Sequence, residues 1–169
     1  MRIPVTLAAA VLILGWGALA NAQTKFTLAS QCAKADPEQA APVNDQPGHV
    51  LAVSKTKCTL SGGEINGLAA KEQEVTAYAD VRGARSRAQG YVVVTVQNGD
   101  KAFVSFDGTG NQPQGQSGTG EGKWRFTGGT GKLKGLKGSG TYKSTNNADG
   151  TSADQIEGDW AIAAAPAKK

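Results

Sequence analysis

The chain has 169 residues, with 18 lysines and arginines against 14 aspartates and glutamates, and a formal net charge of +4 at pH 7. Because the excess is mild and both signs are interspersed, the composition predicts no nucleic-acid partner. His49 is the single histidine, so any histidine-containing metal site or Ser-His-Asp triad would have to use it. We expect His49 to be a surface or strand-start residue, and we predict no catalytic residue, cofactor-binding residue or metal ligand.

Residues 1–22 have the pattern of a cleavable secretory signal. Arg2 is followed by an apolar run over residues 5–19 and then by the small-residue site Ala20-Asn21-Ala22. The run is shorter than the roughly twenty apolar residues of a transmembrane helix. We therefore expect cleavage after Ala22 and an exported protein, periplasmic or extracellular, without integral membrane association. Loss of Arg2 lowers the net charge to +3.

Two cysteines, Cys32 and Cys58, fall in the exported part. An even pair in an oxidising compartment indicates one disulfide. A redox pair would normally show C-x-x-C spacing, which this chain lacks. The bridge is expected to tie the N-terminal segment to an early strand and to stabilise the fold by about 3 kcal/mol through loop-closure entropy.

Alternating apolar and polar residues predict short half-buried strands. The clearest local signal is Asn98-Gly99, which joins two β-rich runs, because both residues accept the left-handed backbone of a tight hairpin. The last strand is expected to turn Ile156, Trp160 and Ile162 inward. The predicted strands cover residues 25–30, 49–60, 74–81, 91–97, 101–108, 123–126, 140–144 and 155–163.

Three segments are expected to be loops. Residues 33–48 contain three prolines, which strand and helix interiors exclude. Residues 64–73 show little periodicity, and we expect a connecting loop there, with a single helical turn as the alternative. Residues 109–122 are a low-complexity run of Gly, Gln, Ser and Thr, too polar to bury. The tail at 164–169 is expected to be frayed.

The segment Thr127–Tyr142 contains six glycines in sixteen residues. Glycine at this density allows positive φ and close backbone approach, so we expect a tight corner between two strands with Lys132, Lys134 and Lys137 in solvent. A phosphate-binding loop is not predicted, because Leu133 stands where the nucleotide motif needs Ser or Thr after the lysine.

About eight short strands with regularly spaced turns, and no convincing helical period, predict an all-β domain over residues 23–163. A sandwich and an up-and-down barrel both fit this count. Sequential hairpins favour the antiparallel barrel, because closure removes exposed strand edges.

The run GKWRFTGGTGKLKGLKGSGTY, preceded by NGDKAFVSFDGTG and followed by IEGDW, resembles small exported bacterial proteins of the allene oxide cyclase barrel-like type, within the calycin-like group. The resemblance covers roughly residues 90–162. It implies an eight-stranded antiparallel barrel with an apolar interior. In the plant cyclases, such a barrel encloses an unsaturated fatty-acid epoxide and steers its ring closure by shape. No catalytic residue of those enzymes maps onto this chain.

The charged residues suggest no site of their own. The carboxylates at the turns and on the strands are expected to be solvated, namely Asp100, Asp107, Asp149, Asp154, Glu157 and Asp159. Two basic groups, Arg82, Arg85 and Arg87 in one and Lys132, Lys134 and Lys137 in the other, could form a rim that attracts an anion. The plainer interpretation is two solvated loops.

Six aromatic side chains are candidates for lining a cavity. They are Tyr91, Phe103, Phe106, Trp124, Tyr142 and Trp160. An eight-stranded barrel leaves room either for packed side chains or for one small ligand, and both alternatives stay open. The leading hypothesis is a non-enzymatic exported barrel that binds a small apolar molecule, without cofactor and with unknown oligomeric state. The alternatives are an isomerase or cyclase acting by cavity shape and a structural envelope interaction protein.

Overall fold

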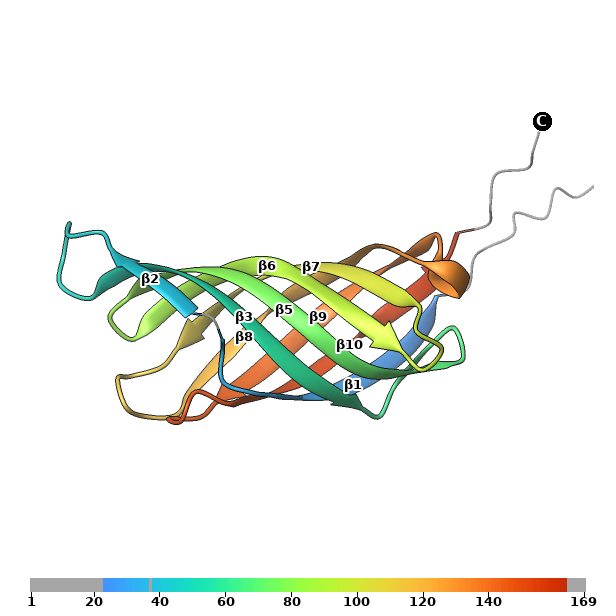
Figure 1. Ribbon diagram of the computed structural model, residues 1–169, viewed down its shortest axis with the longest axis horizontal. Helices are drawn as coiled ribbons and strands as arrows, with labels where there is room; N and C mark the ends of the chain where they lie inside the picture. Colours follow the sequence, from blue (N-terminus) through green and yellow to red (C-terminus); the bar gives the residue numbers. More distant parts are fainter. Residues whose placement is uncertain (1–22, 37, 164–169) are drawn as a thin grey trace, which may run out of the picture.

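Eight antiparallel strands close into a barrel in the computed structural model, which describes residues 23–36 and 38–163 (Figure 1). The predicted eight-stranded barrel is confirmed. The predicted signal at 1–22 and tail at 164–169 lie outside the described residues. The barrel strands follow one another around the wall in chain order: β1 (Thr24–Cys32), β3 (His49–Ser61), β5 (Leu68–Arg82), β6 (Arg85–Val96), β7 (Lys101–Asn111), β8 (Gly118–Gly129), β9 (Leu136–Asn146) and β10 (Ser152–Ile162).

Strand β1 closes the barrel. It pairs with β10 along its whole length, from Thr24 opposite Trp160 to Cys32 opposite Ser152. On its other edge it pairs with β3 only over the segment from Ala29 to Cys32. The predicted disulfide is present there, since Cys32 lies opposite Cys58 and the two sulfurs are bonded at 2.05 Å. The shortest seam of the barrel is therefore the one that carries a covalent link.

The two faces of the wall differ in polarity. On β8 and β9, outward positions such as Lys123, Arg125 and Lys143 are exposed, whereas Trp124 and Phe126 between them are buried. This alternation follows from the period of two along a strand. At these positions the outer face is therefore polar and the inner face apolar. No helix among residues 23–36 and 38–163 has the length and apolarity to cross a bilayer.

The expected loop at 33–48 contains a strand, so that prediction is wrong in part. Strand β2 (Glu38–Pro42) pairs with β3 from Val50 to Ser54, beyond the point where β1 leaves β3. All five of its residues are exposed. Proline is tolerated here because Pro42 ends a short edge strand.

The expected loop at 64–73 is also wrong. Strand β4 (Glu64–Ile65) and the start of β5 form a hairpin around Asn66 and Gly67, both of which have positive φ. Ile65 and Leu68 are buried on the inner side of this hairpin. The sequence does not show a regular alternation of apolar and polar residues here, because a bulge between Ala70 and Glu72 shifts that alternation by one residue.

The expected loop at 109–122 is shorter than predicted, because β7 continues to Asn111 and β8 begins at Gly118. The Asn98-Gly99 hairpin between β6 and β7 is confirmed, with φ of +84° at Gly99. The glycine corner is confirmed as well. It contains the short 3₁₀ helix η1 (Gly131–Leu133), and all three lysines of the corner are exposed.

The two ends of the barrel carry different structures. At the η1 end, shown at the right of Figure 1, lie η1, the β4–β5 turn and the Asn98-Gly99 turn. At the β2 end, on the left, lie β2 and the turns after β5, β7 and β9. Side chains fill the interior at the η1 end, where Ile65, Ala102, Leu133 and Leu136 have no exposed surface. This part is called the filled half below.

Candidate functional site

The barrel interior holds a cavity of about 260 Å³. Aliphatic and aromatic side chains form most of its deeper wall, which also includes the buried Gln73, and most of the polar side chains lie nearer the β2 end. The cavity is lined by apolar Phe26, Leu28, Ile65, Val75, Ala88, Val92, Val94, Val104, Phe106, Trp124, Phe126 and Ile156, and by polar Thr56, Gln73, Ser86, Thr109, Tyr142, Ser144, Asn146, Ser152 and Asp154, with Cys32 and three glycines.

The cavity exists because inward side chains are small toward the β2 end. On β6 the first inward residues are Ser86 and Ala88, followed by three valines deeper in. On β7 they are Gly110 and Gly108, and on β8 the first cavity-lining residue is Gly120. The region lined by these residues is called the hollow half below. Removing side-chain volume at these positions leaves space that the backbone cannot fill.

Aromatic rings cover other inward glycines on the neighbouring strand. In register, Phe106 lies opposite Gly90, Trp124 opposite Gly140 and Tyr142 opposite Gly122. A Cβ atom added at Gly90 would lie 2.8 Å from Cε1 of Phe106, and one at Gly122 would lie 2.7 Å from Cε1 of Tyr142. These glycines provide the space in which a ring lies flat against the wall.

Trp124 is the first large side chain on β8 below the hollow half. Its ring packs at 4.9 Å from Phe126 and 5.5 Å from Phe26, both edge to face. Its Nε1–H donates to the carbonyl oxygens of Thr141 and Glu157, each at 3.2 Å. Because its polar atom is satisfied and its ring is packed, Trp124 is a fixed part of the cavity wall.

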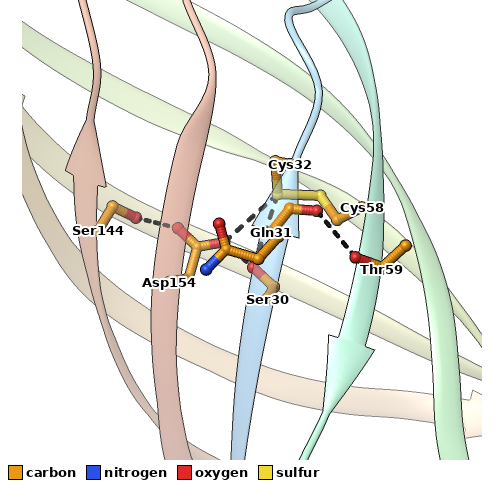
Figure 2. The surroundings of a disulfide bond; sticks show 7 residues. All are labelled: Ser30, Gln31, Cys32, Cys58, Thr59, Ser144 and Asp154. Carbon is orange, nitrogen blue, oxygen red and sulfur yellow. Dashed lines mark hydrogen bonds between the residues drawn. A yellow bond between two sulfur atoms is a disulfide. The ribbon is translucent and has the colours of Figure 1, made fainter.

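A carboxylate faces the cavity from β10. Asp154 accepts a hydrogen bond at Oδ1 from Ser144 Oγ of β9 and one at Oδ2 from Ser30 Oγ of β1, each at 2.5 Å (Figure 2). Cys32 Sγ lies 3.6 Å from Oδ2, so the disulfide borders the same cluster (Figure 2). Each oxygen of this partly buried carboxyl group therefore has one hydroxyl donor.

Tyr142 stands beside this cluster on β9. Burial, reinforced by the negative charges of Asp154 and Asp107, raises the pKa of the Tyr142 phenol to about 12. The hydroxyl therefore keeps its proton at neutral pH and can act as a donor toward the cavity. Its ring packs edge to face against Phe106 at 6.0 Å.

The six predicted lining residues are divided by the structure. Phe106, Trp124 and Tyr142 lie together on the cavity wall. Trp160 packs against the core but does not line the cavity. Tyr91 and Phe103 lie on the outer face with 68% and 37% of their surface exposed, so their prediction is corrected. The presence of an aromatic residue in a strand does not show which face of the strand it occupies.

Several charged residues lie elsewhere than the sequence suggested. The arginines of the β5–β6 hairpin are at the β2 end and the lysines of the glycine corner are at the η1 end, so they form no common rim. His49 does begin a strand, but it is buried, with Nδ1 2.5 Å from Asp45 and Nε2 3.1 Å from Asp80. Among the described residues no group of three or more metal-ligating side chains is found.

Asp154 is the site residue that the sequence interpretation missed, since it was expected to be solvated. The signal was available. Stepping back by two along β10 from Ile156 gives Asp154 and then Ser152, which share its inward face.

Fold and cavity together define a class, a closed antiparallel barrel with a hollow, partly polar interior. Comparison with known proteins adds nothing to this description: no family model matches the chain and no curated protein matches it.

Proposed function

We propose that this protein is an exported, non-enzymatic β-barrel that binds one small, largely apolar molecule inside the barrel. The observation that carries the proposal is the cavity of about 260 Å³ whose deeper wall is made mostly of packed apolar side chains. Drug-sized ligands occupy pockets of roughly 300–1,000 Å³. The expected ligand is therefore smaller than a drug molecule, of the size of a single ring with a short substituent.

Two observations support export. The signal-like pattern of residues 1–22 precedes the barrel, and Cys32 and Cys58 are disulfide-bonded, which is typical of oxidising compartments. We also propose membership of the allene oxide cyclase barrel-like group, on the strength of the glycine-corner motif and the closed eight-stranded barrel.

Gly120 allows a direct test of ligand binding. A Cβ atom at this position would meet its nearest neighbours, Ser144 Cβ and Thr109 O, at an ordinary 3.5 Å. Gly120→Leu should therefore fill the cavity with little strain on the backbone. Thr119→Leu, one residue away on the outer face, is the matched control.

Native mass spectrometry of protein purified from its own compartment should show a bound small molecule in the wild type and in Thr119→Leu, and a ligand-free mass in Gly120→Leu. A ligand-free wild type that also takes up no small aromatic compound added at millimolar concentration would refute the proposal.

A second candidate function is an isomerase or cyclase that acts by cavity shape. Asp154 and a Tyr142 hydroxyl that retains its proton line one cavity, and such a pair can serve as base and acid. This candidate requires turnover of an unsaturated epoxide added to purified protein. Turnover should fall by about a hundredfold or more in Tyr142→Phe, and a racemic product formed at the uncatalysed rate would exclude it.

A further inference from the structure

We propose that the ligand carries a protonated amine, and that Asp154 binds this group while the apolar body of the molecule lies against the aromatic wall. This inference rests on the proposed function, since it assumes that the cavity takes a ligand. It names the ligand class as a small amphiphilic amine with one cationic head and one aromatic or short aliphatic body.

The charge of the cavity wall is the first argument. Asp154 is the one charged side chain among the described residues that line the cavity. The ion pairs found over residues 23–36 and 38–163 involve Asp45, Glu74 and Asp80, but not Asp154. A partly buried carboxylate that lacks a cationic partner has lost part of its hydration without gaining an ion pair. A cationic ligand would supply that partner and offset the desolvation cost of the charge.

The hydrogen bonds of Asp154 are the second argument. A carboxylate offers about four acceptor sites on its two oxygens. Ser144 uses one site on Oδ1 and Ser30 one on Oδ2, so each oxygen retains acceptor capacity. The serines also hold the carboxylate in one orientation. An ammonium group has three N–H donors and no acceptor, which suits a site made of carboxylate oxygens.

The third argument is the surface beside the carboxylate. Phe106, Trp124 and Tyr142 lie on the same cavity wall, with Phe106 and Tyr142 in edge-to-face contact. Aromatic faces attract cations and also pack well against apolar groups. One end of the cavity thus favours a positive head and the other an apolar body.

Anionic ligands fit the cavity less well. Arg82, Arg85 and Arg87 are exposed and line the wider opening at the β2 end, which Asp154 also borders, but they do not line the cavity of about 260 Å³ itself. An anion inside would meet the charge of Asp154 and no cation to balance it. A neutral alcohol could donate one hydrogen bond but would leave the charge uncompensated.

Three compounds with one skeleton test the inference: phenethylamine, phenethyl alcohol and phenylacetate. Isothermal titration calorimetry of the wild-type protein at pH 7 and low salt should give an affinity for the amine about tenfold or more above that for the alcohol, with phenylacetate weakest. Equal binding of the amine and the alcohol would overturn the inference and leave the proposed function standing. Absence of binding by all three would overturn both.

Variants of β10 test whether Asp154 causes the preference for the amine. Asp154→Asn keeps the shape and removes the charge, so amine binding should fall about tenfold and the amine should no longer bind more tightly than the alcohol. Glu157→Gln removes the same charge from the exposed outer face of the same strand and should leave both affinities as in the wild type. Asp154→Glu keeps the charge and should retain the preference for the amine, which covers a failure of Asp154→Asn to fold. Retention of that preference in a folded Asp154→Asn protein would contradict the inference.

Discussion

The filled and hollow halves of the barrel share one wall but differ in what the wall carries inward. In the filled half the inward positions are apolar and most are large, and Leu133 and Leu136 have no exposed surface. In the hollow half they are glycine, alanine and serine, with Asp154 among them. Most seams are paired in both halves, whereas β1 and β3 pair only from Ala29 to Cys32 and β8 pairs with β9 only as far as Arg125. Strand pairing therefore determines that a barrel forms, whereas the volume of the inward side chains determines which part of it is hollow.

The largest expected effect lies at the boundary of the two halves. Trp124→Ala should lower the free energy of unfolding by about 3–5 kcal/mol, because it leaves a void among packed rings and two carbonyl groups without their donor. Phe103→Ala, at a partly exposed outer position, should cost about 1 kcal/mol or less. Urea unfolding followed by circular dichroism measures both. Similar losses in the two variants would mean that the packed rings at this boundary contribute no more stability than a ring on the outer face.

The disulfide should come next. Replacing both cysteines by alanine should cost about 3 kcal/mol, given a sequence separation of 26 residues between them. The effect is expected to be large because the seam between β1 and β3 is short and borders the hollow half. Reduction of the wild type before urea unfolding should reproduce the loss. Unchanged stability after reduction would contradict a structural role for the bridge.

Alanine substitutions at two glycines on neighbouring strands should change the stability of the protein in opposite directions. Gly140→Ala should cost about 2 kcal/mol, because its Cβ would overlap Glu157 O and approach Trp124 Cζ2 to 2.7 Å. Gly120→Ala should stabilise by about 0.5 kcal/mol, because its Cβ enters free space and the unfolded chain loses freedom. Melting temperatures of the pair measure the difference. Destabilisation of equal size at both positions would show that the hollow half is already packed.

The smallest expected effect is a dependence on alkaline pH. The pKa of Tyr142 rises from 10.0 to about 12 on folding. Its contribution to stability is complete below pH 10 and is lost as the pH rises toward about 12, since only the unfolded state ionises within that range. The loss should be on the order of 1 kcal/mol, because the ring is partly open to the cavity. Tyr142→Phe should remove this dependence, and urea unfolding at several alkaline pH values measures it.

Local signals predicted much of the fold. The Asn98-Gly99 hairpin and the glycine corner were found from residues that favour left-handed backbone. The same dipeptide at Asn66-Gly67 was overlooked, because the bulge before Glu72 interrupts the alternation that would have marked β5 as a strand. A local irregularity thus concealed a turn whose residues were otherwise unambiguous.

The site was less predictable, for a physical reason. A glycine in a loop and a glycine beneath an aromatic ring look alike in a sequence, and only the strand register pairs Gly122 with Tyr142. For this reason the sequence of residues 109–122 predicts a loop, although its two ends belong to β7 and β8. The inward phase of β10 was recognised at Ile156 but not extended back to Asp154. Likewise, an aromatic residue can be placed inside the barrel only when it is known which alternate positions of its strand face inward. Tyr91 and Phe103 occupy outward positions.

The pairing of β1 with β10 also governs when the barrel can form. Ser30 and Asp154, which meet across this seam, are 124 residues apart in the chain. The first barrel strand therefore has no full-length neighbour until the last one has been synthesised. Contacts of such sequence separation are slow to form, so folding is expected on the millisecond-to-second scale. We therefore expect the cluster around Asp154 to form only once β1 and β10 have paired, and a chain that ends before β10 would lack it.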